Sequence, residues 1–128
     1  MEELVIRRFD APDDMLSFEK GTFELVRAGG LTLGRARYEP GWKWSEHVRP
    51  LAGTESCQVA HVGLVVSGRA AIRMDDGREV VVGPGDLFVV PPGHDSWVVG
   101  EEPYVSLHFL GAERYAQEET AEPSRPLP

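Results

Sequence analysis

Short segments rich in β-branched and aromatic residues alternate with glycine- and proline-containing turns along most of this sequence. The turns recur about every eight to twelve residues, and Asp76-Gly77 and Pro91-Pro92-Gly93 are two of them. This rhythm predicts an all-β fold, a sandwich or barrel of short antiparallel strands. The expected strands are Phe23–Ala28, Leu31–Tyr38, Val59–Val66, Ala70–Met74, Glu79–Val82, Asp86–Val90, Ser96–Val99 and Tyr104–Leu110.

The Asp76-Gly77 pair marks the clearest hairpin, because glycine accepts the positive φ that a tight turn requires. Helix signals are weak, and residues 10–19 are expected to begin a short helical turn with Asp13 or Asp14 as the cap. The chain has 128 residues, a length typical of one domain. We expect a single barrel over residues 1–115 and a disordered, polar, proline-rich tail over residues 116–128.

The charge of the chain restricts its partners. A formal net charge of −8 opposes binding to nucleic acid and to anionic lipid. Residues 1–10 lack the apolar run of a secretion signal or membrane span, and the single cysteine, Cys57, cannot form an internal disulfide. These features predict a cytoplasmic protein that binds neither nucleic acid nor membrane.

One spacing in the middle of the chain brings together residues that bind metals. Five residues separate Gly41 from His47, and further along three residues separate Cys57 from His61. Six more residues then precede Gly68. This arrangement resembles the first motif of the cupin superfamily, in which two histidines and a glutamate bind a metal.

The segment Gly85–His94 resembles the second cupin motif, which places a glycine, a Pro-x-Gly turn and then a histidine ligand. Here His94 follows the glycine directly, whereas the family commonly has its histidine where this chain has Ser96. Both positions share the same strand parity, so either side chain can point inward. The resemblance implies a double-stranded β-helix, the jelly-roll barrel of the cupins.

The resemblance also implies a set of metal ligands. His47 takes the place of the first histidine, Cys57 that of the second, and His61 that of the glutamate, while His94 supplies the ligand of the second motif. The loop between His47 and Cys57 splits a pair that is adjacent in the family, so His47 is equally well an acid or base near the barrel mouth. Asp95 is a candidate acceptor for an imidazole N–H.

Thiolate and imidazole ligands favour zinc over manganese or magnesium, with iron, nickel and copper as alternatives. On a straight strand, Cys57 and His61 would lie about 13 Å apart along the backbone. They can therefore share one metal only where the chain bends or bulges between them.

Two classes of function fit these residues. The first is an enzyme in which zinc acts as a Lewis acid on a small organic molecule, in isomerase, lyase or hydrolase chemistry, with His47 or His108 as acid or base. An iron-dependent dioxygenase is a variant of this class. The second is a non-enzymatic cupin that binds a small ligand or a metal. His108 is left out of the ligand set.

Other residues have open roles. Trp42, Trp44 and Trp97 either line a pocket or fill the core. Arginines and a tyrosine on the expected strands could contact a carboxylate substrate, although exposed strand faces carry such residues routinely; they are Arg35, Arg37, Arg73 and Tyr38. A homodimer follows from the resemblance, with residues 3–8 as an exchanged edge strand.

Overall fold

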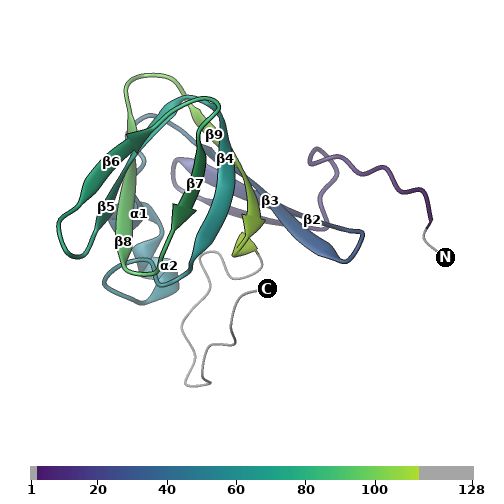
Figure 1. The fold of residues 1–128 in the computed structure, drawn as a ribbon, viewed down its shortest axis with the longest axis horizontal. Helices are drawn as coiled ribbons and strands as arrows, with labels where there is room; N and C mark the ends of the chain where they lie inside the picture. Colours follow the sequence, from purple (N-terminus) through teal and green to yellow (C-terminus); the bar gives the residue numbers. More distant parts are fainter. Residues whose placement is uncertain (1–2, 113–128) are drawn as a thin grey trace.

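The structure, a computed structural model, describes residues 3–112. Short antiparallel strands make up most of this part of the chain (Figure 1). The strands are β1 (Asp14–Phe18), β2 (Gly21–Ala28), β3 (Leu31–Tyr38), β4 (His61–Ser67), β5 (Arg69–Met74), β6 (Glu79–Val82), β7 (Leu87–Val90), β8 (His94–Val99) and β9 (Tyr104–Leu110). Two single-turn helices, α1 (Trp44–His47) and α2 (Arg49–Ala52), lie between β3 and β4.

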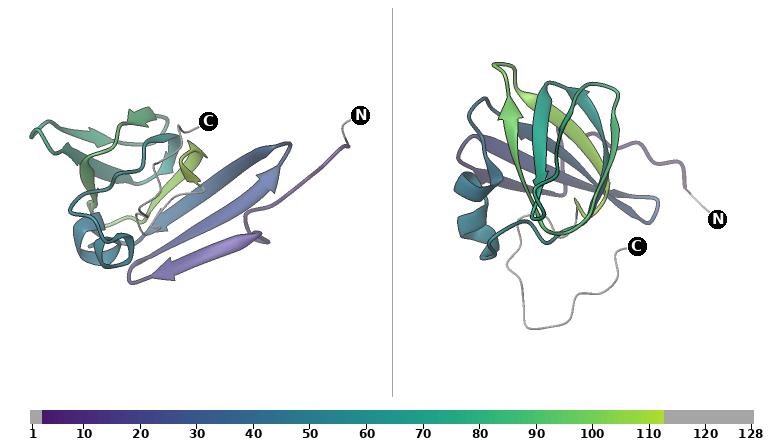
Figure 2. Two further views of the ribbon diagram at one scale, coloured as in Figure 1. Left: turned by 90° about the horizontal axis from the view of Figure 1, so that it is seen from below. Right: turned by 60° about the vertical axis from the view of Figure 1, so that its left-hand side comes forward.

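The strands form two sheets. The larger has the order β1-β2-β3-β9-β4-β7 and the smaller the order β6-β5-β8, and all pairings are antiparallel. The smaller sheet lies opposite the β9-β4-β7 side of the larger one, while β1 and β2 extend beyond it (Figures 1 and 2). This is the all-β jelly-roll architecture that the sequence predicts.

Successive side chains of a strand point to opposite faces of the sheet, so every second side chain lies between the two sheets. On β4, for example, His61, Gly63 and Val65 are buried, whereas Val62 and Leu64 lie on the opposite face. The buried apolar cluster consists of Phe23, Ala36, Tyr38, Trp42, Trp44, Val48, Ala52, Cys57, Val59, Val65, Ala70, Ile72, Phe88, Val90, Val98, Tyr104 and Ala112.

The eight strands predicted from the sequence are present, with ends that differ by two residues or fewer. The Asp76-Gly77 hairpin joins β5 to β6 in the register Arg73↔Glu79, and Gly77 has a φ of 96°. The turn prediction is confirmed because it depends on local backbone chemistry.

The prediction of a helical turn within residues 10–19 is wrong. Residues Asp14–Phe18 form β1, which pairs with β2 in the register Asp14↔Leu25. Asp13 does not cap a helix: its carboxylate accepts a hydrogen bond from the backbone N–H of Arg27 at 2.7 Å and pairs with Arg7. Both partners lie outside residues 10–19, so a helix-cap pattern within that segment could not include them.

Residues 3–8 run extended away from the body of the molecule and do not form a strand in this structure (Figure 2). Leu4 is 94% exposed and Ile6 is 83% exposed. The exchange of this segment within a homodimer concerns a second copy of the chain and remains a prediction.

The predicted tail, residues 116–128, and the domain boundary at residue 115 lie outside the described residues. Within residues 3–112, no helix has the length and apolar character needed to cross a membrane.

Candidate metal centre

Cys57 and His61 approach each other because the chain bends between them. β4 begins only at His61, and residues 58–60 belong to no strand. As a result, Cys57 Sγ lies 3.5 Å from His61 Nε2. The bend that the sequence analysis required for a shared metal is therefore present.

His94 is held beside this pair by backbone pairing. The N–H of Cys57 donates to the carbonyl of His94 at 2.7 Å, and the N–H of Gly93 donates to the carbonyl of Cys57 at 2.7 Å. The rings of His61 and His94 meet edge to face, with their centroids 5.3 Å apart. Two segments more than thirty residues apart in sequence thus converge at one point.

The imidazole of His94 is oriented by a main-chain carbonyl. Its Nδ1 lies 2.8 Å from the carbonyl oxygen of Pro91, which can only accept a hydrogen bond. This contact places a proton on Nδ1 and leaves Nε2 deprotonated. Asp95, the acceptor suggested by the sequence, instead accepts hydrogen bonds from the backbone N–H and the hydroxyl of Ser45.

The three side chains fit a metal ion. One potential ligand atom from each of Cys57, His61 and His94 lies within 4.8 Å of the others, and all three residues are buried. From typical Zn–S and Zn–N bond lengths, two such ligands of one tetrahedral zinc lie about 3.5 Å apart. The Cys57–His61 separation matches this value, and the donor set is the soft one that zinc prefers.

Burial keeps these imidazoles neutral. Desolvation, together with the nearby His108 and His94, holds the pKa of His61 well below its usual range. Desolvation also lowers the pKa of His94, although the Pro91 carbonyl and the charge of Asp95 oppose the shift. Neutral imidazole is the form that binds metals, so both rings are ready to act as ligands near neutral pH.

His108 lies next to the cluster on β9. Its ring centroid is 5.2 Å from that of His61, and its Nε2 lies 3.1 Å from the hydroxyl of Ser106. Burial, followed by the influence of His94, lowers the pKa of His108 to about 4. Burial raises the pKa of the Tyr104 phenol to about 12, and a hydrogen bond with Ser106 opposes this shift. These three side chains share one face of β9 because they are two residues apart.

His47 lies away from this cluster, in the last turn of α1. Its Nδ1 accepts a hydrogen bond from the backbone N–H of Lys43 at 3.0 Å. It does not belong to the Cys57, His61 and His94 group and does not line the pocket beside it.

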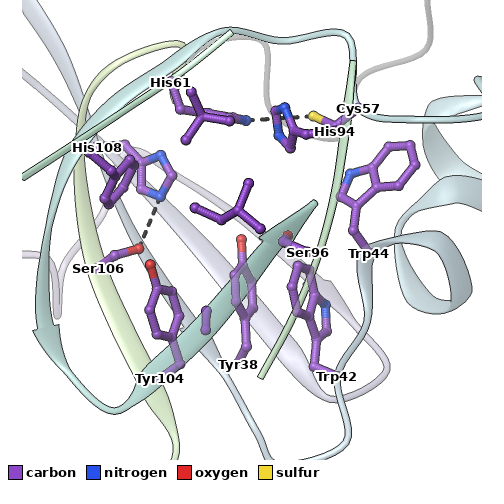
Figure 3. A pocket seen from close by; sticks show the side chains of 14 residues that line it. Tyr38, Trp42, Trp44, Cys57, His61, His94, Ser96, Tyr104, Ser106 and His108 are labelled. Carbon is purple, nitrogen blue, oxygen red and sulfur yellow. Dashed lines mark hydrogen bonds between the residues drawn. The ribbon is translucent and has the colours of Figure 1, made fainter. Parts of the chain in front are cut away.

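The cluster opens on a pocket between the two sheets with a volume of about 50 Å³. Figure 3 shows Cys57, His61 and His94 at one end and Tyr38, Trp42 and Tyr104 at the other. The fourteen lining residues are Tyr38, Trp42, Trp44, Cys57, His61, Ala70, Ile72, Phe88, Val90, His94, Ser96, Tyr104, Ser106 and His108.

The pocket settles several roles that the sequence left open. Trp42 and Trp44 line it, whereas Trp97 does not. Ser96 lines it together with His94, as their shared strand parity predicts. Tyr38 faces inward, but the arginines considered with it do not line the pocket; Arg35 pairs with Glu24 and Arg37 pairs with Glu39.

Sequence reasoning missed Tyr104 and Ser106 as pocket residues. The available signal was the alternation along the predicted strand Tyr104–Leu110, which places both on the same face as His108.

A jelly roll with a buried Cys–His–His cluster between its sheets is the arrangement that the cupin resemblance predicts, and the family comparison confirms the cupin superfamily. The family model of the AraC-binding-like domain matches residues 7–99, and the chain belongs to this family.

Solved structures share this fold at low sequence identity. A protein of unknown function from Rhizobium leguminosarum is 24% identical with a TM-score of 0.52, over 82% of this chain and 95% of that one. A cupin-2 domain protein from Rhodospirillum rubrum is 20% identical with a TM-score of 0.52, over 82% of this chain and 65% of that one. An oxalate decarboxylase from Lactobacillus farciminis, in a formate complex, is 18% identical with a TM-score of 0.54, over 74% of this chain and 30% of that one. The sequence matches no curated protein.

Proposed function

We propose that this protein is a metal-dependent cupin enzyme that binds zinc through Cys57, His61 and His94 and acts on a small organic molecule in the adjoining pocket. The observation that carries the proposal is the buried Cys–His–His cluster at one end of a cavity. Three protein ligands, rather than four, are typical of catalytic zinc sites, which keep one position for water or substrate.

The chain's own residues have defined roles in this proposal. The Pro91 carbonyl orients His94, and burial keeps His61 and His94 neutral for binding. His108, next to His61 and hydrogen-bonded to Ser106, exchanges a proton with the substrate. His47 is left out of the proposed site, because it neither lines the pocket nor belongs to the Cys57, His61 and His94 group.

Zinc bound by these ligands would polarise a carbonyl or carboxyl oxygen as a Lewis acid. The reaction classes that use such polarisation without a redox step are those of isomerases, lyases and hydrolases. Most of the pocket lining is apolar, and the lower effective dielectric there strengthens electrostatic interactions.

A second candidate is a cupin that binds a small ligand or metal without catalysis. It is supported by the small space open beside the cluster, about 50 Å³. Product formation from any molecule that raises the melting temperature of the metal-loaded protein would exclude this candidate.

Metal content tests the proposed site. Elemental mass spectrometry on protein expressed without a histidine tag should find about one zinc per chain, and Cys57→Ala and His94→Ala should each lose it. His47→Ala is the matched control and should retain the metal. Iron in place of zinc would redirect the proposal toward dioxygenase chemistry. Absence of metal from wild-type protein after loading, or its retention in both ligand variants, would overturn the site.

A further inference from the structure

Two buried indole N–H groups border the pocket without an acceptor. Trp42 and Trp44 are each 2% exposed, and the Nε1 atoms of both find no hydrogen-bond partner among residues 3–112. Buried donors without partners are rare in native proteins and call for an explanation. Figure 3 shows that Trp44 turns the nitrogen-bearing edge of its ring toward the pocket interior, on the side of Cys57 and His94.

The lining of the pocket has no fixed charge of its own. Among the described residues that border it, none is an aspartate, glutamate, lysine or arginine. A divalent metal held by one thiolate and two neutral imidazoles would leave the site with a net charge of plus one. An isolated buried charge is strongly unfavourable, so a ligand with a single negative charge would neutralise the loaded site. A neutral ligand would leave the charge uncompensated, and a dianion would reverse it.

The volume of the pocket limits the size of this ligand. The space open to a water-sized probe is about 50 Å³, which favours a small ligand over a bulky one. Formate and acetate, which have three and four non-hydrogen atoms, are the smallest monocarboxylates.

We propose that the pocket binds a small monocarboxylate whose charge matches the metal-loaded Cys57, His61 and His94 site and whose oxygen accepts a hydrogen bond from Trp44 Nε1–H. This inference rests on the proposed metal site and names the ligand class for it. The carboxylate supplies both features that the pocket lacks: a single negative charge and an acceptor for a buried donor.

Cobalt(II)-substituted protein provides the test, because its thiolate charge-transfer band reports metal binding at Cys57 and its visible bands report the remaining coordination. Formate and acetate should shift the visible bands with saturation, whereas sulfate and methanol should not. Trp44→Phe should raise the dissociation constant for acetate at least about tenfold, the effect of losing one hydrogen bond to a charged group, while the charge-transfer band remains. Trp97→Phe is the matched control, since Trp97 lies outside the pocket, and should leave the constant unchanged.

The outcomes separate the two proposals. A charge-transfer band that persists without any response to formate or acetate overturns the carboxylate inference alone, as does a response of equal strength to sulfate. Unchanged acetate affinity in Trp44→Phe overturns the role of the indole. Absence of the charge-transfer band from wild-type protein overturns the metal site, and the carboxylate inference with it. The ligand series on wild-type protein tests the inference independently of how any variant folds.

Discussion

The two ends of the pocket are built on different principles. At one end, Cys57, His61 and His94 bring polar atoms together in a buried position. At the other end, Tyr38 stacks on Trp42 with centroids 3.8 Å apart and planes 5° apart, and Tyr104 follows at 6.0 Å and 13°. The polar end carries the candidate chemistry, while the aromatic end is a stack of buried rings from β3, β9 and the loop after β3.

This contrast has an energetic basis. Burying large aromatic surfaces stabilises a fold, and stacked pairs add to that effect. Burying imidazoles removes them from water and disfavours their charged forms, which costs stability unless a ligand compensates. The aromatic end should therefore dominate stability, and the polar end should dominate metal binding and the response to acid.

The largest expected effect on stability comes from the aromatic end. Trp42→Ala removes a fully buried ring that stacks on Tyr38, and it should lower the free energy of unfolding by about 3–5 kcal/mol. Urea denaturation of metal-free protein measures this change. Trp97→Ala is the matched control, and its smaller effect follows from the partial exposure of that ring. A loss below about 1 kcal/mol for Trp42→Ala would contradict the expectation that the aromatic end dominates the stability of the fold.

Acid should destabilise the metal-free protein through the polar end. The pKa values of His61, His94 and His108 are lowered in the folded state, that of His108 to about 4, whereas an unfolded histidine titrates near 6.5. Between these values the unfolded chain binds more protons, so the free energy of unfolding falls as the pH drops from about 6.5 to 4. His108 alone should account for a loss on the order of 3 kcal/mol.

Denaturation curves measured across this pH range test the effect. The three aspartates with lowered pKa, Asp10, Asp13 and Asp76, lose their stabilising contribution only below about pH 3.8, so they do not contribute to this window. His108→Leu should flatten the dependence. An equal slope in wild type and variant would show that His108 is not the source.

The strands could be predicted from the sequence because their turns are local. Gly77 accepts its positive φ wherever the rest of the chain lies, so the hairpin that it closes was correctly placed. β1 was missed because the turn that joins it to β2, Glu19-Lys20, has no Asp-Gly or Pro-Gly signal, although Lys20 adopts a φ of 66° there. Pairing with β2 and the hydrogen bond from the Arg27 N–H to Asp13 then hold the segment extended.

The sequence predicted three residues of the candidate site but neither the position of His47 nor the contacts that orient the side chains. Motif spacing selected Cys57, His61 and His94, which the structure brings together, but it could not place His47, because two short helices fill the loop after β3. The orientation of His94 depends on a main-chain carbonyl, and no residue type encodes that contact. Likewise, the sequence allowed a tryptophan to line the pocket, but it could not show that Trp44 lacks an acceptor there.

The smallest expected effect lies where the two ends meet. Tyr104, at the aromatic end, shares a hydrogen bond with Ser106, whose hydroxyl lies 3.1 Å from Nε2 of His108. Tyr104→Phe keeps the stacked ring and removes only the hydroxyl, so it should cost about 1 kcal/mol. A double-mutant cycle with Ser106→Ala isolates the contact, and its coupling energy should be of the same size. A coupling energy near zero would mean that the two ends are energetically independent, because Ser106 is the link through which the aromatic end reaches His108.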